Sequence, residues 1–256
     1  MNILPESDFF LPLRELAGKL GQWPDCADLS MLASERSICN AKGLPVSFVE
    51  DRGKDYEERI YLRGEVQTRS SSWHDLFNAF VWMSFPKAKA HLNAVHFHEM
   101  AIQAGKNRGE MRDIATLFDE SGVIVASSDE SLSNMLRNFE WKRLFWEHRE
   151  SVRNGMRFYV FGHGLYEKGL APFVGLTGHG LIFPVGHSFF GFPPEKQRFL
   201  LDESFATRYS KIRTTRDFSP VPVLGYPGWT RENDLEAYYE NERYFRRGRS
   251  GIRGIQ

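Results

Sequence analysis

One segment, residues 73–85 (WHDLFNAFVWMSF), constrains the fold most strongly because its apolar residues recur at helical spacing. Ser72 precedes it and Asp75 follows three residues later, a pattern that resembles a capping box with Asp in place of the usual Glu. Pro86 lacks a backbone N–H, so it either ends this helix or occupies the first turn of the next one. We therefore expect two consecutive helices around Pro86, the second covering residues 87–104.

The other expected elements are shorter and of both kinds. Helical patterns lie at residues 13–20, 27–36, 129–154, 163–170 and 195–210. Strand-like runs cover residues 45–49, 60–68 and 157–161, and residues 117–126 have the pattern of a hairpin. An extended, proline-stiffened loop is expected at residues 219–229. Because helices predominate, the sequence predicts an α+β fold, a mainly helical single domain with a small sheet of short strands.

The composition sets the size and the charge of this domain. With 256 residues, the chain is near the upper size that one hydrophobic core supports. Its 33 basic residues balance 33 acidic ones, so the net charge gives no general attraction to nucleic acid or to an anionic membrane. The basic excess is confined to the arginine-rich end of the chain. We expect an N-terminal helical segment (1–44), a main α+β domain (45–242) and a basic flexible tail (243–256).

Cysteine usage and the start of the chain indicate the compartment. Cys26 and Cys39 are too far apart for a C-x-x-C redox pair or a zinc knuckle, which favours reduced thiols. The first residues carry no basic stretch before an apolar run, unlike a secretory signal peptide, and no apolar run is long enough to span a membrane. We expect a cytoplasmic protein without membrane attachment, whose partner is a small molecule or a protein. Nucleic acid is expected to bind only through the arginine tail.

Polar side chains that can do chemistry gather first on the two helices around Pro86. All eight histidines lie at or after His74, so the first quarter of the chain supplies no imidazole. His74 and Asn78 are one turn apart on one helix, and Asn93 and His96 share a face of the next. If the two helices are antiparallel, these residues approach one another.

A second polar pair follows the strand at residues 157–161. There a glycine leads into His163, at the start of an expected helix, where the dipole favours neutral imidazole. Glu167 lies one turn later on the same face, so the pair offers two metal ligands, or a base and its orienting carboxylate. The alternative stays open: a histidine among aromatic residues is commonly a core or capping residue, and Asp75 in a first helical turn is commonly a cap.

Together these residues predict one site for a divalent metal ion that activates water. The expected catalytic residues are His163, Glu167, His74 and Asp75. The expected metal ligands are His74, His96, His163 and Glu167. The expected substrate-binding residues are Arg69, Asn78, Asn93 and Lys89. The chain has no P-loop, no dinucleotide-binding G-x-G-x-x-G after a strand, no H-E-x-x-H and no G-x-S-x-G.

Four segments carry a resemblance to a known family: residues 64–96, 118–122 (FDESG), 161–170 (FGHGLYEKGL) and 220–229 (PVPVLGYPGW). In order and spacing the chain resembles the bacterial family catalogued as domain of unknown function 3025, over about residues 45–247. The resemblance brings no activity, fold or cofactor with it. It implies that the polar candidates named above occupy signature positions of the family.

Two hypotheses of function follow. In the first, the protein is a metal-assisted hydrolase of a phosphoester or a similar small substrate. In the second, the protein is a non-catalytic module that binds a ligand or a protein, and the same polar residues form a buried hydrogen-bond network. The loop at 219–229 or the arginine tail then contacts the partner.

Overall fold

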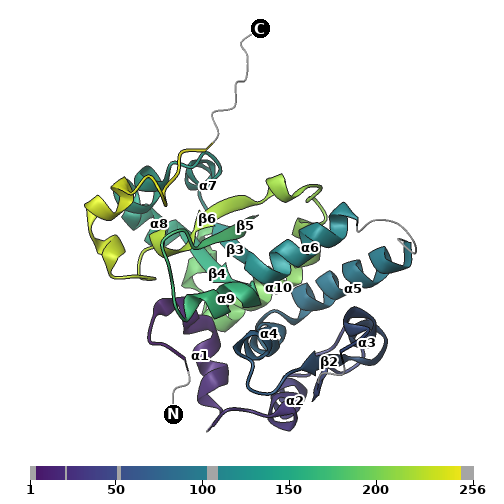
Figure 1. The fold of residues 1–256 in the computed structure, drawn as a ribbon. Helices are drawn as coiled ribbons and strands as arrows, with labels where there is room; N and C mark the ends of the chain where they lie inside the picture. The colour runs from purple at the N-terminus through teal and green to yellow at the C-terminus, as the bar shows by residue number, and fades with distance from the viewer. Residues whose placement is uncertain (1–3, 21, 51–52, 103–108, 249–256) are drawn as a thin grey trace.

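A four-stranded mixed sheet with the strand order β4-β3-β5-β6 lies at the centre of the fold (Figure 1). Every residue of β3 (Gly122–Ser127) is buried, as expected of a central strand. It pairs antiparallel with β4 (Met156–Val160) and parallel with β5 (Thr177–Pro184), and β5 pairs antiparallel with β6 (Ser219–Pro222). The computed structural model describes residues 4–20, 22–50, 53–102 and 109–248.

Helices pack on this sheet and on one another, which gives the predicted α+β fold. The helix α4 (Trp73–Ser84) contacts α5 (Pro86–Ile102) and α9 (His163–Gly169), while α5 also contacts α6 (Glu110–Ser121) and α10 (Pro194–Tyr209). Figure 1 shows α5 and α6 side by side in front of α10. The helix α9 also contacts α6, so α4, α6 and α9 meet in one region.

A smaller unit packs beside these helices and closes one side of that region. It contains α2 (Cys26–Glu35), α3 (Tyr56–Arg63) and a parallel pair of strands, β1 (Ser47–Glu50) and β2 (Glu65–Thr68). Gly64 joins α3 to β2 with a φ of +75°, and a side chain there would clash with the carbonyl oxygen of Pro45. Only glycine fits this turn without strain. The contact of α3 with α5 then fixes the unit against the main helices.

Both ends of the described chain pack onto this core. Near the N-terminus, η1 (Asp8–Phe10) leads into α1 (Leu11–Gly18), and the buried ring of Phe9 contacts Tyr166 and Trp229. Near the C-terminus, Tyr244 and Phe245 are buried, so the expected flexible tail begins with two packed aromatic residues. Residues 249–256 of that tail lie outside the described residues.

Four local predictions were wrong or incomplete. Residues 117–121 form the last turns of α6 rather than one arm of a hairpin, and β3 follows directly. Residues 60–63 belong to α3 rather than to a strand. The expected helix at 129–154 is broken into three: α7 (Glu130–Arg137), a π-helical turn (Arg143–Glu147) and α8 (Arg149–Gly155). The expected loop at 219–229 contains β6 and the 3₁₀ turn Val223–Gly225.

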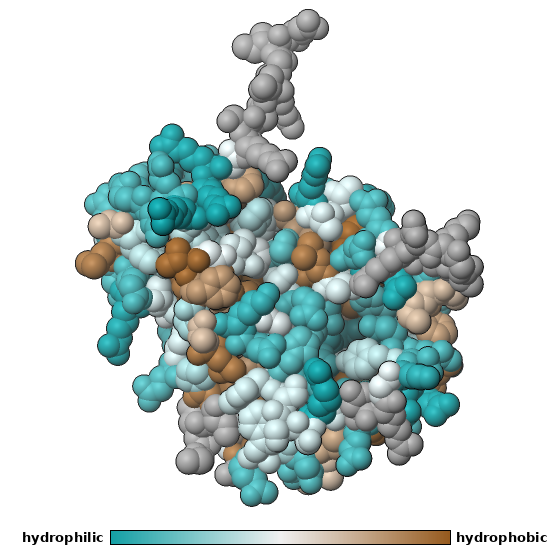
Figure 2. All heavy atoms as spheres, viewed as in Figure 1, coloured by the Kyte–Doolittle hydropathy of each residue, from teal (hydrophilic) through white to brown (hydrophobic). Residues whose placement is uncertain are grey.

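Short 3₁₀ turns complete the described fold. They span His187–Gly191, Thr215–Asp217, Glu232–Asp234 and Glu236–Glu240. Figure 2 shows a largely hydrophilic face with separate hydrophobic patches. Within the described ranges, no helix has the length and the apolar character needed to cross a membrane.

Candidate metal centre

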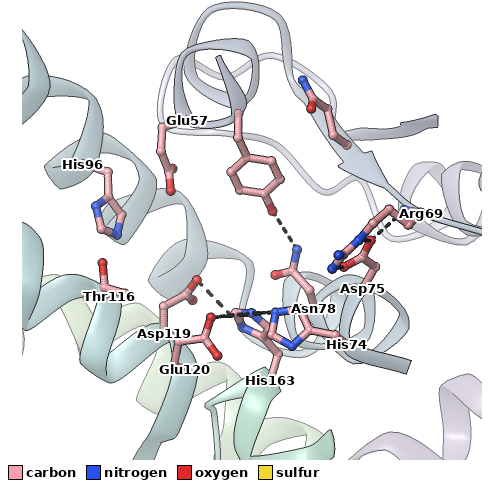
Figure 3. A pocket seen from close by; sticks show the side chains of 12 residues that line it. Glu57, Arg69, His74, Asp75, Asn78, His96, Thr116, Asp119, Glu120 and His163 are labelled. Atoms are coloured by element: carbon pink, nitrogen blue, oxygen red, sulfur yellow. Dashed lines mark hydrogen bonds and ion pairs between the residues drawn. The ribbon is translucent and has the colours of Figure 1, made fainter. Parts of the chain in front are cut away.

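A cavity of about 300 Å³ lies where α3, α4, α5, α6, α9 and β2 meet (Figure 3). Every side chain that lines it carries a polar group, and both charged and neutral ones are present. The residues that line it are Tyr56, Glu57, Gln67, Arg69, His74, Asp75, Asn78, His96, Thr116, Asp119, Glu120 and His163. Three histidines from three different helices, His74, His96 and His163, thus open onto the same cavity.

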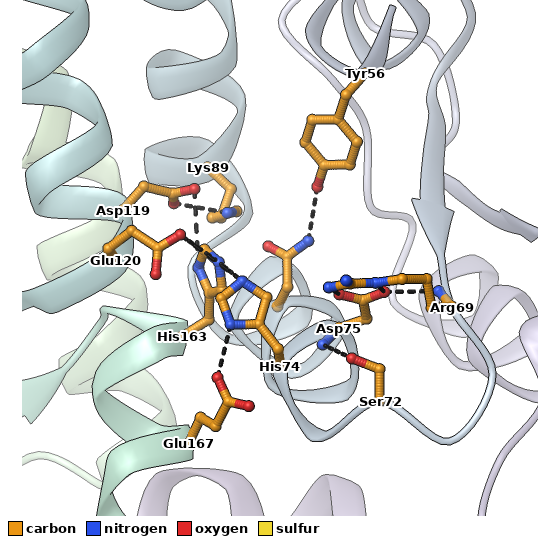
Figure 4. Close-up of polar contacts among 11 residues, drawn as sticks. Tyr56, Arg69, Ser72, His74, Asp75, Lys89, Asp119, Glu120, His163 and Glu167 are labelled. Carbon is orange, nitrogen blue, oxygen red and sulfur yellow. Dashed lines mark hydrogen bonds and ion pairs between the residues drawn. The ribbon is translucent and has the colours of Figure 1, made fainter. Parts of the chain in front are cut away.

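Three side chains at the floor of the cavity converge on a common point (Figure 4). The Nε2 atoms of His74 and His163 are 3.0 Å apart. The Oε1 atom of Glu120 is 3.4 Å from Nε2 of His163 and 3.7 Å from Nε2 of His74. A tetrahedral ion with bonds of about 2.0–2.1 Å places its donor atoms roughly 3.3–3.4 Å apart. The triangle of donor atoms therefore has the size of one face of a tetrahedral metal site, and we call these three residues the metal triad.

A carboxylate lies behind each histidine, but only the one behind His74 is within hydrogen-bond distance of the ring. Glu167 Oε2 lies 2.9 Å from Nδ1 of His74, and Asp119 Oδ2 lies 3.8 Å from Nδ1 of His163. A carboxylate beside Nδ1 favours the tautomer with the proton on that atom, which leaves the Nε2 lone pair free to bind a metal. Two such lone pairs and the Glu120 carboxylate repel one another at these distances unless a cation or a proton lies between them.

Asp119 is itself held by a buried ion pair. The ammonium group of Lys89 lies 2.6 Å from Asp119 Oδ1, and the Lys89 side chain is only 5% exposed. Burial alone would raise the pKa of Asp119, but the charges of Lys89 and His163 outweigh it and hold the pKa below its usual range. Burial would also raise the pKa of Glu120, but its hydrogen bond and charge interaction with His163 outweigh this effect and hold the pKa below its usual range. Both carboxyls are therefore ionised at neutral pH.

Local backbone geometry explains how the metal triad is assembled. His74 is the second residue of α4, Glu120 is in the last turn of α6, and His163 begins α9. Gly162, just before α9, packs so closely on the end of α6 that an added side chain would lie 2.5 Å from the Glu120 carbonyl oxygen and from the Ser121 backbone. The glycine thus allows His163 to approach Glu120.

The upper wall of the cavity has a second polar group centred on Glu57. The amide of Asn93 donates hydrogen bonds to the backbone oxygen and to Oε2 of Glu57, at 2.9 and 2.8 Å. Burial raises the pKa of Glu57 to about 7, against the opposing effect of the Asn93 hydrogen bond. His96 and Thr116 line the same wall (Figure 3). A carboxyl of this kind exchanges its proton near neutral pH, as a general acid or base must.

The side wall carries an arginine and an unsatisfied amide oxygen. Arg69 donates through Nε and Nη2 to the two carboxylate oxygens of Asp75, at 2.9 and 2.8 Å, and its side chain is 58% exposed. Asn78 is buried and donates to the Tyr56 hydroxyl, but its Oδ1 atom has no hydrogen-bond partner among the described residues. A buried amide oxygen without a partner is a place for a donor from a bound molecule.

The structure separates the expected site residues into several roles. His74 and His163 belong to the metal triad, whereas Glu167 contacts the far side of His74 and His96 lies on the cavity wall outside the triad. The expected binding and acid residues lie in polar pairs of their own. These pairs are Asp75 with Arg69, Lys89 with Asp119, Asn93 with Glu57, and Asn78 with Tyr56.

Glu120 is the member of the metal triad that the sequence interpretation omitted. It lies in the FDESG segment (118–122), which was interpreted as a hairpin turn. The preceding residues Ile114, Ala115 and Phe118 are buried on one face of α6, at the spacing of an amphipathic helix. That spacing, together with Gly122 at the start of an all-apolar strand, was the signal that could have placed Glu120 at a helix end.

The fold and the cavity define an α+β protein with a candidate metal centre of two histidines and one glutamate. The chain belongs to the DUF3025 family, described as proteins of unknown function, whose family model matches residues 46–249. No curated protein and no solved structure matches the chain significantly.

Proposed function

We propose that this protein is a metal-assisted hydrolase of a phosphoester or a similar small substrate. The observation that carries the proposal is the triangle of His74 Nε2, His163 Nε2 and Glu120 Oε1, with edges of 3.0, 3.4 and 3.7 Å beside a cavity. Two imidazoles and one carboxylate are the ligand set of many catalytic zinc sites, which leave the fourth position for water. A zinc ion held by these residues would lower the pKa of its bound water to about 7 and so would supply a nucleophile at neutral pH.

The other cavity residues suit the remaining steps of a hydrolysis. Arg69 is held in place by Asp75 and is still exposed, so it can pair with an anionic oxygen of the substrate. Glu57, with its pKa near 7, is the proposed proton donor to the leaving oxygen. The water oxygen would bond to phosphorus and lose a proton to solvent, the ester bond would break, the alcohol would leave with the proton from Glu57, and Glu57 would regain a proton from solvent. A cavity of about 300 Å³ is at the small end of ligand sites and favours a small substrate.

The test is hydrolysis by untagged protein loaded with Zn²⁺ or Mn²⁺ and supplied with p-nitrophenyl phosphate, bis-(p-nitrophenyl) phosphate or p-nitrophenyl acetate. We expect metal-dependent release of p-nitrophenol that falls at least 100-fold in Glu120→Gln and is unchanged in His187→Ala, a control at an exposed histidine. With phenyl phosphate, whose more basic leaving oxygen needs a proton, the fall of activity above pH 7 should disappear in Glu57→Gln. Equal rates with and without metal, or full activity in Glu120→Gln, would contradict the proposal.

The direct contact between the two histidines also suits a second candidate function. If one ring keeps its proton on Nε2, the 3.0 Å contact of His74 and His163 is a hydrogen bond inside a buried polar network. In that case the protein is a non-catalytic module that binds a small molecule or a protein. A protein that takes up no metal and hydrolyses none of the four substrates, but loses thermal stability in His163→Ala, would favour this second function.

A further inference from the structure

A larger cavity, of about 600 Å³, lies apart from the metal triad, between the C-terminal half of α10, the end of α7 and the β5–β6 edge of the sheet. Four cationic side chains line it: Arg137, Arg208, Lys211 and Arg216. Basic and acidic residues are equal in number over the whole chain, so four cations around one cavity are a local concentration of charge. We call this the basic cavity.

The positive charge of the basic cavity is only partly neutralised. Glu130 pairs with Arg137 at 2.6 Å. Asp217, the acidic residue that lines the cavity, accepts hydrogen bonds from the backbone N–H groups of Arg213 and Thr214 at 2.7 and 2.9 Å, so its carboxylate caps a turn. Within the described part of the chain, the side chains of Arg208, Lys211 and Arg216 have no hydrogen bond or ion pair.

Arg208 is the most constrained of these cations. It lies on α10, is only partly exposed, and its Nε atom is buried without a hydrogen-bond partner among the described residues. Burial and the neighbouring charge of Arg137 lower the pKa of its guanidinium group. Guanidinium groups stay protonated in proteins, so the two repel each other, and the single carboxylate that acts on both, Glu130, balances only one of the two charges. The unused donors of Arg208 and its neighbours therefore fit a ligand with several negative oxygens.

Two aromatic side chains also line the basic cavity. Phe218 is buried and its ring stacks on Phe118, whereas Phe139 is partly exposed and its ring packs edge-on against Trp141 with ring centres 5.3 Å apart. An aromatic ring beside a group of cations matches a ligand with a phosphate group at one end and a flat apolar body at the other. The volume of about 600 Å³ is within the range of small-molecule sites.

We propose that the basic cavity binds a phosphorylated small molecule of nucleotide type. Its phosphates lie against Arg137, Arg208, Lys211 and Arg216, and its aromatic body lies against Phe139, the partly exposed ring of the cavity. This inference is independent of the metal triad, because it uses none of the residues that line the cavity beside the triad.

The test is isothermal titration calorimetry with ATP as the probe, in 0.1 M salt with EDTA present, so that no metal at the triad contributes. Inorganic pyrophosphate and adenosine are the comparison probes. We expect saturable binding of ATP, weaker binding of pyrophosphate and little binding of adenosine. In Arg208→Gln and in Lys211→Ala the Kd for ATP should rise about tenfold or more, as expected when a charged hydrogen-bond partner of phosphate is lost. Arg153→Gln, at an exposed arginine paired with Glu150, should bind ATP like the wild type.

Three results would overturn the proposal. The first is no saturable binding of ATP by the wild type at millimolar concentration. The second is an unchanged Kd in Lys211→Ala, which is an exposed position whose truncation leaves the fold intact even if Arg208→Gln fails to fold. The third is binding of a single-stranded oligonucleotide, with none of ATP, since this would make the basic cavity part of a nucleic-acid surface.

Discussion

Substitution of Glu167 by Gln tests whether Glu167 orients the metal ligand His74 or binds the metal itself. Glu167 Oε2 lies 2.9 Å from Nδ1 of His74, on the side of the ring opposite to the atom that faces the metal triad. Loss of such an outer carboxylate costs 10–100-fold in metal affinity, about 1.4–2.7 kcal/mol. The Glu167 side chain is 47% exposed, so solvent screens its charge. We therefore expect the low end of that range, about tenfold.

The measurement is a competition titration of Zn²⁺ between the protein and a chromophoric chelator, at pH 7.5. His74→Ala removes a ligand and should lose far more affinity than Glu167→Gln. Glu203→Gln, at an exposed carboxylate paired with Lys87, is the matched control and should bind Zn²⁺ like the wild type. An unchanged affinity in Glu167→Gln would refute the orienting role. A loss as large as that of His74→Ala would mean that Glu167 is itself a ligand and that the metal triad is incorrectly defined.

Three further predictions concern stability and pH. Lys89→Met leaves the Asp119 charge buried without its partner and should lower the free energy of unfolding by about 3–5 kcal/mol in urea titrations, with partial recovery when Asp119→Asn is added. Gly162→Ala forces a side chain against the backbone of Glu120 and should cost about 1–3 kcal/mol and weaken Zn²⁺ binding; an unchanged melting temperature and Kd would show that the close approach is not needed. Burial raises the pKa of Asp202 to about 6, although it accepts backbone hydrogen bonds from the start of α5. The protonated form is therefore favoured in the folded state, and its stabilisation, up to about 3 kcal/mol, is present below about pH 4 and lost as the pH rises through 6. Asp202→Asn should remove this dependence, and an unaltered pH profile of unfolding would contradict the assignment.

The elements that local chemistry defines were predictable from the sequence. The helix α4 begins after Ser72, whose hydroxyl accepts from the Asp75 N–H as the capping pattern indicates, and Pro86 begins α5. The segments that were misjudged are those where tertiary contacts outweigh local preference. Phe139 adopts a left-handed conformation, with a φ of +62°, after the end of α7, and its ring packs on Trp141. An aromatic residue rarely adopts this conformation, so no residue type at this position indicates the break.

The site residues also divide into those that the local sequence predicts and those whose position depends on tertiary contacts. His74 and His163 were predictable as candidates because each lies at the start of an expected helix that follows a clear boundary. No spacing in the sequence brings the two rings together, and their meeting depends on the contact of α4 with α9. The pairing of Glu120 with these histidines depends on how the end of α6 meets α9, and nothing local to the FDESG segment encodes that meeting. A capping role, one of the alternatives for such a histidine, does not describe His163, because its Nδ1 atom has no hydrogen-bond partner in the described part of the chain and its Nε2 atom faces His74.

The metal content of the untagged protein tests the central claim most directly. After exposure to excess Zn²⁺ and gel filtration, elemental analysis should find one ion per chain in the wild type and in His187→Ala. It should find almost none in His74→Ala, His163→Ala or Glu120→Gln. A wild type that retains no metal, and whose melting temperature is the same with Zn²⁺ and with EDTA, would contradict a metal centre at these three residues.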